Sequence, residues 1–435
     1  MRIGVHVGAN SVRAAALVDS DVIEAAEPTV GLDDLGDAVA RVLRRVRTRL
    51  GEEISSVIVD VSEVLTPDDS ADVVAVLIEP RIPVVPRRHG WEQDGLRVDT
   101  AQIRGGHTAL GDELVPLDEE ALLQLAATVP AGAHLILSAA GAPCNPVHER
   151  RAAELLRAAA PVASVTESHT FFSDSILVRE HTAVVNALLL RQGEQLSGIL
   201  ADAVARVAGD DARVFVSRND GGCSSLARLS VTPVHSVRSG IAAAVRGAAT
   251  LAGRSSGRLV LALPDAVLIG EFTEGMLPAV ARPPLPAGRA VLASNFAQVV
   301  PLTDLLISGS TEAPVAVAAE GCEGALGAFG LEPALITGHA LVALGASTAP
   351  LSHWHNGIAR IVTANDVAKA LREGAQIARA ALVAAGAAPD DVRVTESRVL
   401  ATSYDEAQVV RIRVRTVAAT PGRHSGRRAT MRGAA

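Results

Sequence analysis

The chain has 435 residues, a length at which proteins usually divide into two or three domains. Hydrophobic residues make up 49% of it but aromatic residues only 2%, so the core must be aliphatic, as in helices packed on buried parallel strands. The net charge of -8 and the few aromatic residues argue against nucleic acid as a partner, because nucleic-acid binding requires a basic surface and stacking platforms.

The three cysteines, Cys144, Cys223 and Cys322, are far apart and form no C-x-x-C pair, so we expect free thiols rather than a zinc or redox site. The N-terminus begins a strand at once and lacks the apolar segment of a signal peptide. No run reaches the ~18 apolar residues that a membrane span needs. We therefore expect a cytoplasmic protein that does not use a membrane as a partner.

The first predicted element is a β-hairpin. Apolar runs at 2–7 and 12–18 flank Gly8-Ala9-Asn10-Ser11, whose composition is typical of a turn. Apolar residues then recur at helical spacing over 32–50, with arginines on the opposite face. Strand-like runs follow at 57–61 and 73–78.

The middle of the chain alternates between helices and strands. Residues 80–116 mix prolines, glycines and charges without periodicity, so we predict an irregular segment there. The elements predicted after it are a helix at 118–128, a strand at 133–139, a helix from Asn145-Pro146 to 159, a long helix at 183–208, a strand at 213–217 and a polar turn at 218–222. This alternation predicts an α/β fold.

The C-terminal part is predicted to contain a helix and a hairpin. The helix covers 364–385, with Thr363 or Asn365 as its cap, and the strands cover 392–401 and 408–417. In the last strand Val410, Ile412 and Val414 alternate with Arg411, Arg413 and Arg415, which predicts one buried and one solvated face.

Two further segments have predicted structures. The remaining tail, 418–435, contains four arginines among small residues and is predicted to be disordered. His353-Trp354-His355 places two imidazoles on one side of an extended segment, but no third metal ligand accompanies them, so we interpret it as an exposed loop.

Several segments, in this order along the chain, together resemble the hydantoinase A/5-oxoprolinase family, which belongs to the actin-like ATPase superfamily. They are Arg2-Ile3-Gly4-Val5-His6-Val7-Gly8-Ala9-Asn10, Gly111-Asp112-Glu113-Leu114-Val115-Pro116-Leu117-Asp118-Glu119, Asn145-Pro146-Val147-His148-Glu149-Arg150-Arg151, Thr182-Ala183-Val184-Val185-Asn186-Ala187, Arg218-Asn219-Asp220-Gly221-Gly222 and Ser239-Gly240-Ile241-Ala242-Ala243. They cover roughly residues 1–255.

The resemblance implies a two-lobed fold like that of actin and hexokinase (ribonuclease H-like), with the opening hairpin at the floor of a cleft. The implied organisation is an N-terminal lobe at 1–175, a second lobe at 176–350, a small helix-hairpin element at 351–417 and the tail.

The motifs that bind ATP in this family are altered here. Its phosphate-binding hairpin has Asp where this chain has His6, Gly at Ala9, Thr at Val12 and Asp at Arg13. Mg²⁺ prefers oxygen ligands, and imidazole is a poor substitute. The other altered motifs correspond to Asp60-Val61-Ser62-Glu63, Leu261-Ala262-Leu263-Pro264-Asp265 and Ile307-Ser308-Gly309-Ser310-Thr311.

The resemblance nominates ligand-binding residues, but no catalytic residue and no metal ligand. The candidates are Gly8, Asn10, Arg13, Asn219, Gly221, Gly222, Ser239 and Gly240. Ser239-Gly240 begins a helix of small residues that would approach a nucleotide closely. Alternatively, the 219–222 segment is a purely structural turn and Arg13 a solvated strand residue.

Three functions remain open. The first is a hydantoinase-like protein that has lost ATP hydrolysis and acts as a binding, regulatory or assembly subunit. The second is an active ATP-dependent hydrolase of cyclic amide C–N bonds, of hydantoin or 5-oxoproline type, or a carboxylase subunit, and only this one needs ATP and Mg²⁺. The third holds a small anionic ligand without a metal. The resemblance implies a hydantoinase B-like partner chain or a homo-oligomer.

Overall fold

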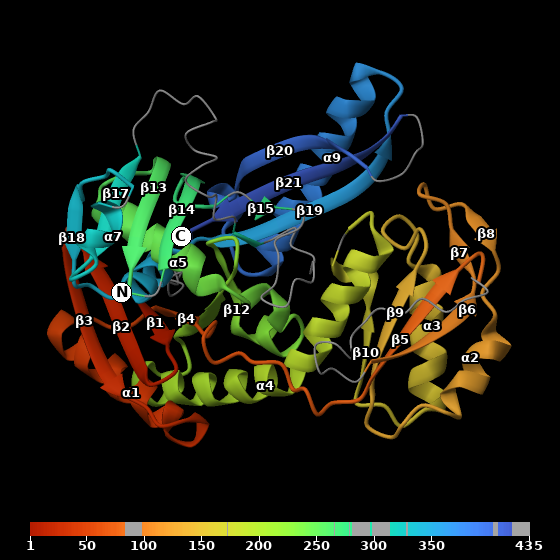
Figure 1. Ribbon diagram of the computed structural model, residues 1–435, viewed down its shortest axis with the longest axis horizontal. Helices are drawn as coiled ribbons and strands as arrows, with labels where there is room; N and C mark the ends of the chain where they lie inside the picture. Colours follow the sequence, from red (N-terminus) through yellow and green to blue (C-terminus); the bar gives the residue numbers. More distant parts are fainter. Residues whose placement is uncertain are drawn as a thin grey trace, which may run out of the picture.

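A computed structural model of the protein describes residues 1–82, 98–171, 173–264, 266–277, 279–280, 296–297, 314–327, 329–402 and 408–419. They form the predicted α/β fold, with mixed sheets and helices packed on them (Figure 1).

Nine strands form the largest sheet, in the order β20-β21-β19-β12-β11-β4-β1-β2-β3. Its N-terminal and middle strands are β1 Arg2–Val7, β2 Ser11–Val18, β3 Asp21–Pro28, β4 Ser56–Asp60, β11 Arg213–Ser217 and β12 Cys223–Ser225. The strands β1, β2 and β3 are antiparallel neighbours, which confirms the predicted opening hairpin. β4 lies parallel to both β1 and β11.

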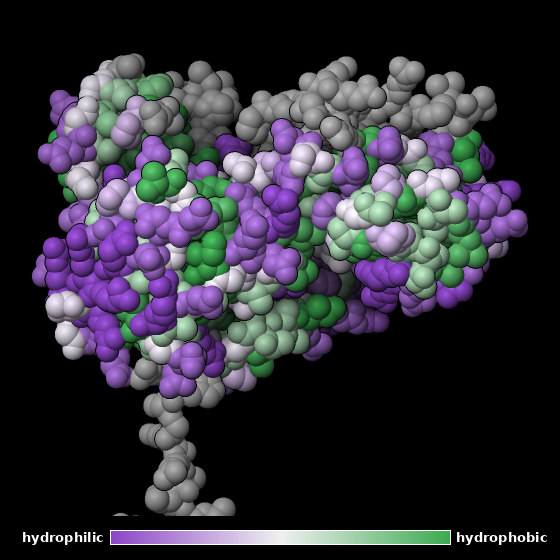
Figure 2. All heavy atoms as spheres, turned by 90° about the horizontal axis from the view of Figure 1, so that it is seen from below, coloured by the Kyte–Doolittle hydropathy of each residue, from purple (hydrophilic) through white to green (hydrophobic). Residues whose placement is uncertain are grey.

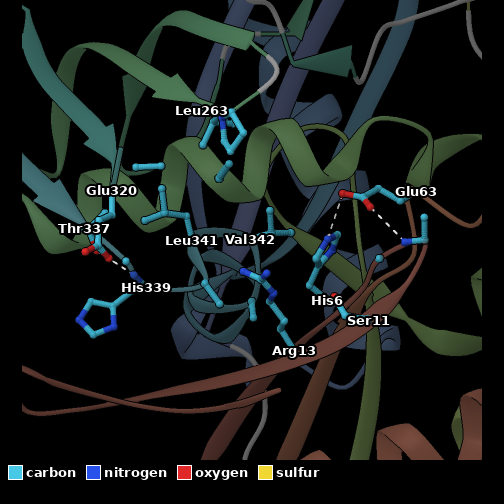
Figure 3. A pocket seen from close by; sticks show the side chains of 18 of the residues that line it. His6, Ser11, Arg13, Glu63, Leu263, Glu320, Thr337, His339, Leu341 and Val342 are labelled. Carbon is cyan, nitrogen blue, oxygen red and sulfur yellow. Dashed lines mark hydrogen bonds and ion pairs between the residues drawn. The ribbon is translucent and has the colours of Figure 1, made fainter. Parts of the chain in front are cut away.

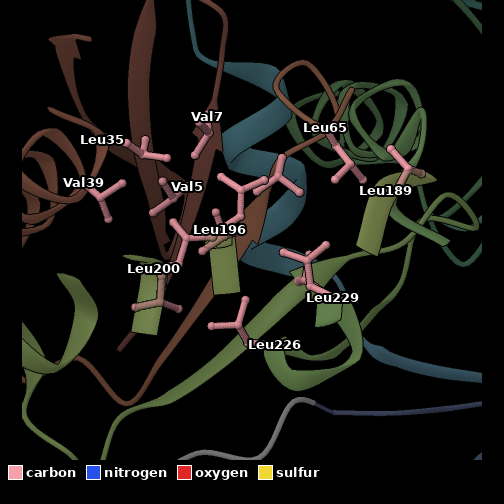
Figure 4. Packing of buried hydrophobic residues seen from close by; sticks show 14 of the residues in the cluster. Val5, Val7, Leu35, Val39, Leu65, Leu189, Leu196, Leu200, Leu226 and Leu229 are labelled. Carbon is pink, nitrogen blue, oxygen red and sulfur yellow. The ribbon is translucent and has the colours of Figure 1, made fainter. Parts of the chain in front are cut away.

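One face of the opening hairpin lies in the main hydrophobic core. Val5 and Val7 belong to the same buried cluster as apolar residues of α1 (Leu32–Leu50) and α4 (Ile176–Ala208) (Figure 4). α1 confirms the predicted helix, whereas α4 begins seven residues before the predicted start at 183. Because residues on a strand alternate in direction, Gly4 and His6 face the other way.

The opposite face of the hairpin packs against helix α8 (Leu341–Thr348). A Cβ atom on Gly4 would overlap the carbonyl oxygen of Ala343, so this position requires glycine. Helix α5 (Ser239–Leu251) approaches α8 in the same way, because a Cβ on Gly345 would overlap the Ala243 carbonyl. These contacts bring the first turn of α8 beside the hairpin.

A second sheet contains four parallel strands in the order β10-β9-β5-β6. Its elements are β5 Val73–Glu79, β6 Val98–Arg104, β9 His134–Ala139, β10 Ser164–Glu167, the small hairpin β7 Gly106–His107 and β8 Glu113–Val115, and the helices α2 Glu119–Ala126 and α3 Val147–Ala159. The prediction of an irregular segment at 80–116 is therefore wrong from residue 98 onward. β6 lies at the sheet edge and carries polar, partly exposed residues, so it lacks an apolar run.

A third sheet has the order β14-β13-β17-β18 and lies against α5. Its elements are β13 Ser256–Leu263, β14 Ala266–Thr273, β17 Val315–Ala319, α7 Glu323–Gly327 and β18 Leu335–Thr337, and β15 Ala279–Val280 pairs with β16 Phe296–Ala297 nearby in the chain. Short 3₁₀ turns occur at Ser168–Phe171, Leu226–Ser230, Pro233–Ser236 and Pro389–Asp391.

The predicted C-terminal helix and hairpin are confirmed. They consist of β19 Leu351–Arg360, α9 Ala364–Ala384, β20 Arg393–Ala401 and β21 Val409–Ala418. Thr363 caps α9, since its Oγ1 accepts the Asp366 N–H at 3.3 Å while Asp366 accepts the Thr363 N–H at 2.7 Å. The predicted tail lies outside the described residues from 420 onward, and Ala418 is still part of β21.

The predicted solvated face of the last strand is wrong. Arg411, Arg413 and Arg415 are only 5%, 5% and 4% exposed. The guanidinium groups of Arg413 and Arg415 lie over the Trp354 ring, 5.3 and 4.8 Å from its centroid. The interpretation of 353–355 as an exposed loop is also wrong, because this segment lies in β19 beside β21 and provides the buried Trp354. Arginine can be buried in this way because its stem is apolar and its planar head stacks on aromatic rings.

The predicted domain boundaries at residues 175 and 350 stay a prediction. Strands from the two sides of each boundary pair with one another in the largest sheet. β4 pairs with β11 across the first, and β12 pairs with β19 across the second.

Among the described residues, no helix combines the length and the apolar composition needed to cross a membrane.

Candidate functional site

A cavity of about 680 Å³ lies between the opening hairpin and the first turn of α8 (Figure 3). We call it the hairpin cavity. One wall consists of His6, the turn residues 8–11 and Arg13, and the facing wall consists of residues 337–343. Glu63 lies beside the hairpin, and Leu263, Pro264, Ala319 and Glu320 from the third sheet complete the lining with Ala244 of α5. The cavity is thus built from strand ends that lie more than 300 residues apart in the chain.

His6 is held between two carboxylates at the edge of this cavity. Its Nδ1 lies 3.2 Å from Oδ1 of Asp60, and its Nε2 lies 3.1 Å from Oε1 of Glu63. Asp60 is fully buried at the end of β4, directly opposite His6 in the parallel register of β1 and β4. Parallel pairing therefore creates a contact between residues 54 positions apart.

His6 is an imidazolium at neutral pH. Burial alone would lower its pKa, but the hydrogen bonds to Asp60 and Glu63 and the two negative charges outweigh burial and raise the pKa to about 9. The hydrogen bond to His6 is also the main reason that the pKa of Glu63 is lowered. Both ring nitrogens of His6 thus carry protons and donate hydrogen bonds to carboxylates.

Both carboxylate oxygens of Asp60 accept further hydrogen bonds. Ser239 donates its hydroxyl proton to Oδ2, and Ser62 donates both its N–H (3.3 Å) and its hydroxyl (2.8 Å) to Oδ1. The Gly240 N–H donates to the Ser62 hydroxyl at 3.1 Å. Ser239 and Gly240, which the sequence nominated as ligand contacts, do not line the hairpin cavity. They hydrogen-bond to Asp60 and Ser62 behind it.

Mg²⁺ does not fit at this position of the hairpin. A hard cation needs oxygen atoms with free lone pairs, whereas Asp60 accepts from three side chains and the His6 imidazolium lies between the two carboxylates. The cationic imidazolium would also repel a second cation. His6 therefore supplies the positive charge that a metal would otherwise provide between these groups.

The turn itself offers few free donors. The Gly8 N–H donates to the Ser11 carbonyl at 2.9 Å, and the Ala9 N–H donates to Oε2 of Glu63 at 3.2 Å. Gly8 and Asn10 line the cavity, but the Gly8 amide is not available to a ligand. A phosphate cradle made from this turn is therefore incomplete.

Positive potential comes instead from Arg13 and from α8. Arg13 lies on β2 with its side chain directed into the cavity (Figure 3), and no hydrogen bond or ion pair is found for it among the described residues. Facing it, Leu341, Val342 and Ala343 form the first turn of α8, where backbone N–H groups have no intrahelical acceptor. A helix N-terminus and a guanidinium both favour an anion.

The other three nominated residues do not line the cavity. Gly221 and Gly222 form a turn with positive φ at Gly221, in which Asp220 accepts the Gly222 N–H at 3.0 Å. A Cβ on Gly222 would overlap Ser352, and the Asn219 amide donates to the Val234 carbonyl at 3.4 Å. The turn orients Asp220, which accepts the Trp354 indole N–H at 2.8 Å. This is the structural role that the sequence left open for 219–222.

One other group of residues has metal-ligand chemistry. In the described part of the chain, His107, Glu113 and His148 bring donor atoms within 4.8 Å of one another. However, the Gly106 N–H donates to Nδ1 of His148 at 2.8 Å, so the proton is on Nε2, which lies 2.9 Å from Glu113. A protonated Nε2 has no lone pair for a metal. His148 and Glu113 therefore form a hydrogen-bonded pair and not a metal site.

Sequence reasoning identified Gly8, Asn10 and Arg13 but missed the residues that face them. Asp60 and Glu63 were recognised only as the remnant of an altered motif, and their pairing with His6 follows from a strand register that no local pattern reveals. Residues 337–343 carried no recognised signal. The segment 307–311, which was compared with a family loop, lies outside the described residues.

Comparison with known proteins supports the fold alone. No protein-family model and no curated protein sequence matches the chain. Acetone carboxylase in a nucleotide-free structure, described for ATP-dependent acetone carboxylation, has a TM-score of 0.60 and 11% identity over 97% of this chain and 88% of that one. The ATP-dependent caprolactamase of Pseudomonas jessenii has a TM-score of 0.64 and 13% identity over the same shares. At these identities the likeness shows that this chain shares its fold with both proteins.

Proposed function

We propose that this chain is a hydantoinase-like protein that binds a small anion in the hairpin cavity without a metal and does not hydrolyse ATP. It then acts as a binding, regulatory or assembly subunit in the cytoplasm, together with a hydantoinase B-like partner chain or a second copy of itself. The fold likeness supports the general kind of protein, and the altered hairpin supports the loss of hydrolysis.

The observation that carries this proposal is the position of His6. An imidazolium between Asp60 and Glu63 occupies the position between the two carboxylates and neutralises one of the two negative charges that would attract Mg²⁺. Phosphoryl transfer relies on metal ions to neutralise the charge that develops on the phosphate oxygens. A cavity with Arg13 and the start of α8 but without this metal position can bind an anion and lacks the means to cleave a nucleotide.

A second function is favoured by a different observation. Two ATP-dependent enzymes share the fold, and the hairpin cavity is as large as typical small-ligand pockets. If ATP is bound with Mg²⁺ held elsewhere, for example near Glu320, the chain is an ATP-dependent hydrolase of cyclic amide C–N bonds or a carboxylase subunit.

Calorimetric titration with inorganic phosphate, ADP and ATP, each with Mg²⁺ and with EDTA, separates the two functions. The proposal expects binding of phosphate that is the same in Mg²⁺ and in EDTA, and no release of phosphate from ATP. Binding that requires Mg²⁺, or ATP hydrolysis above that of a buffer control, would establish the second function instead.

A further inference from the structure

A second, smaller cavity adjoins the hairpin cavity. It has a volume of about 350 Å³ and lies at the edge strand β3, so we call it the edge cavity. Arg13, Gly338 and Ala340 line both cavities. A ligand in the hairpin cavity can therefore extend past Arg13 into the edge cavity.

The edge cavity carries an excess of positive charge. Its lining includes Arg13 from β2 and Arg45 and Arg49 from α1, against the single carboxylate of Glu24. Helix α1 packs on the face of the largest sheet opposite to α8. Its residues Arg45 and Arg49 reach the edge cavity past the edge strand β3. In Figure 2 the side of the molecule that carries α1 is strongly hydrophilic. Arg45 and Arg49 are exposed residues of this helix.

The neighbouring carboxylates leave part of this charge unbalanced. Arg45 pairs with Glu27 at 2.6 Å, but Glu27 also accepts from Arg41 at 3.1 Å. Arg49 donates to the backbone carbonyl of Glu24 at 2.6 Å, and no carboxylate lies within ion-pair distance of it among the described residues. These contacts hold both guanidinium groups at the cavity and leave donors on each of them.

The Glu24 carboxylate contacts the loop between β18 and α8. Its Oε2 accepts the Ala340 N–H at 3.0 Å, and its Oε1 lies 3.5 Å from Nδ1 of His339. Glu24 thus ties the β18–α8 loop, which lines both cavities through Gly338 and Ala340, to β3.

We propose that the ligand carries two separated anionic groups, one in the hairpin cavity and one held by Arg45 and Arg49 in the edge cavity. The chemical class is an extended dianion, such as an α,ω-dicarboxylate or a phosphorylated carboxylate, whose first anionic group pairs with Arg13 in the hairpin cavity. This inference rests on the proposed anion-binding function and adds the substrate class to it.

The test compares ligands with one and with two anionic groups on the full-length protein. Inorganic phosphate and hexanoate report on the hairpin cavity, and the dicarboxylates from malonate to suberate report on both cavities. Each charge-assisted contact strengthens binding by about tenfold or more. We therefore expect at least one dicarboxylate to bind about tenfold more tightly than its matched monocarboxylate, such as adipate against hexanoate.

Arg49→Ala and Arg45→Ala should each remove this advantage and leave the affinity for phosphate unchanged. Arg44→Ala is the matched control, because Arg44 is exposed on the same helix but does not line the edge cavity. If phosphate binds but the dicarboxylates gain nothing, or if the variants leave that gain intact, the inference is wrong and the proposed function stands. If neither phosphate nor any dicarboxylate binds, both are wrong.

Discussion

His6 gives the hairpin a dependence on pH that can be measured. Its pKa is raised from 6.5 to about 9 in the folded protein, so the folded state binds its proton more tightly than the unfolded state does. The stabilisation is then fully present below about pH 6.5 and is lost as the pH rises through about 9. A shift of this size corresponds to on the order of 3 kcal/mol.

We therefore expect the unsubstituted protein to have a free energy of unfolding that exceeds that of the His6→Gln variant by a few kcal/mol at about pH 6, as measured by urea denaturation. The difference should shrink steadily between about pH 6.5 and pH 9.5. A difference between the two proteins that stays constant over this range would show that His6 is not held as an imidazolium.

Arg13 is the residue on which anion binding in the hairpin cavity depends most directly. Because it has no acceptor among the described residues, its guanidinium can form a bidentate pair with an incoming phosphate or carboxylate. Arg13→Ala should weaken phosphate binding by roughly 1.5–3 kcal/mol, the range for a charged hydrogen bond, and EDTA should have no effect.

The control is Asn219→Ala, which removes a nominated side chain that lies away from the cavity. Phosphate affinity should be unchanged in this variant. Equal losses in both variants would mean that the fold rather than the cavity is being measured, and no loss in Arg13→Ala would remove Arg13 from the site.

At the scale of elements, the position of α8 depends on a glycine in β1. Gly4→Ala places a methyl group where the Ala343 carbonyl lies, so β1 and α8 must move apart. We expect a destabilisation of roughly 1–3 kcal/mol or more, as for overpacked cores. Phosphate binding should weaken as well, because the first turn of α8 lines the hairpin cavity.

Gly198→Ala is the matched control for this substitution. Gly198 lies in α4 with open space around its Cα, so alanine should stabilise the protein by roughly 0.5–1 kcal/mol through its helix propensity. Thermal denaturation of the two variants checks both signs. Equal melting temperatures would mean that the β1–α8 contact is not close.

Elements with a strong local pattern could be predicted from the sequence, and elements stabilised by neighbours could not. The regular apolar spacing of α1 and the capped start of α9 gave correct helices. β6 was missed because an edge strand needs no apolar run. The arginines of β21 were placed in solvent because alternation cannot reveal that Trp354, 61 residues before Arg415, provides a stacking surface.

At the scale of the whole molecule, the hairpin cavity is assembled from distant stretches of the chain. Residues 6–13, residue 63 and residues 337–343 meet only because β1 pairs with β4 and packs on α8. The sequence could nominate the first stretch through its turn chemistry. It could not nominate its counterparts, since parallel register and helix packing leave no short-range signal in composition.

The largest sheet also joins the two ends of the chain, which allows a sharp prediction about the C-terminus. β21 pairs with β19 along its length, and Ala418 is opposite Leu351 in that register. Val417 and Ala418 are buried, and the Thr416 hydroxyl donates to the Ala378 carbonyl of α9 at 3.1 Å. Residues 420–435 lie outside the described residues, and few of them have apolar side chains that could add buried surface.

Truncation after residue 419 should therefore leave the melting temperature unchanged within error, so we expect only the last sixteen residues of the predicted tail at 418–435 to be dispensable. Truncation after residue 415 should lower the melting temperature markedly, because it removes three buried side chains, including the Thr416 hydroxyl that fixes α9 to the sheet by a hydrogen bond. Scanning calorimetry of the two shortened chains beside the full chain makes the comparison. A large loss in the longer of the two would show that residues beyond 419 contribute to the folded core, and an unchanged melting temperature in the shorter one would mean that the end of β21 is not part of the cooperative sheet.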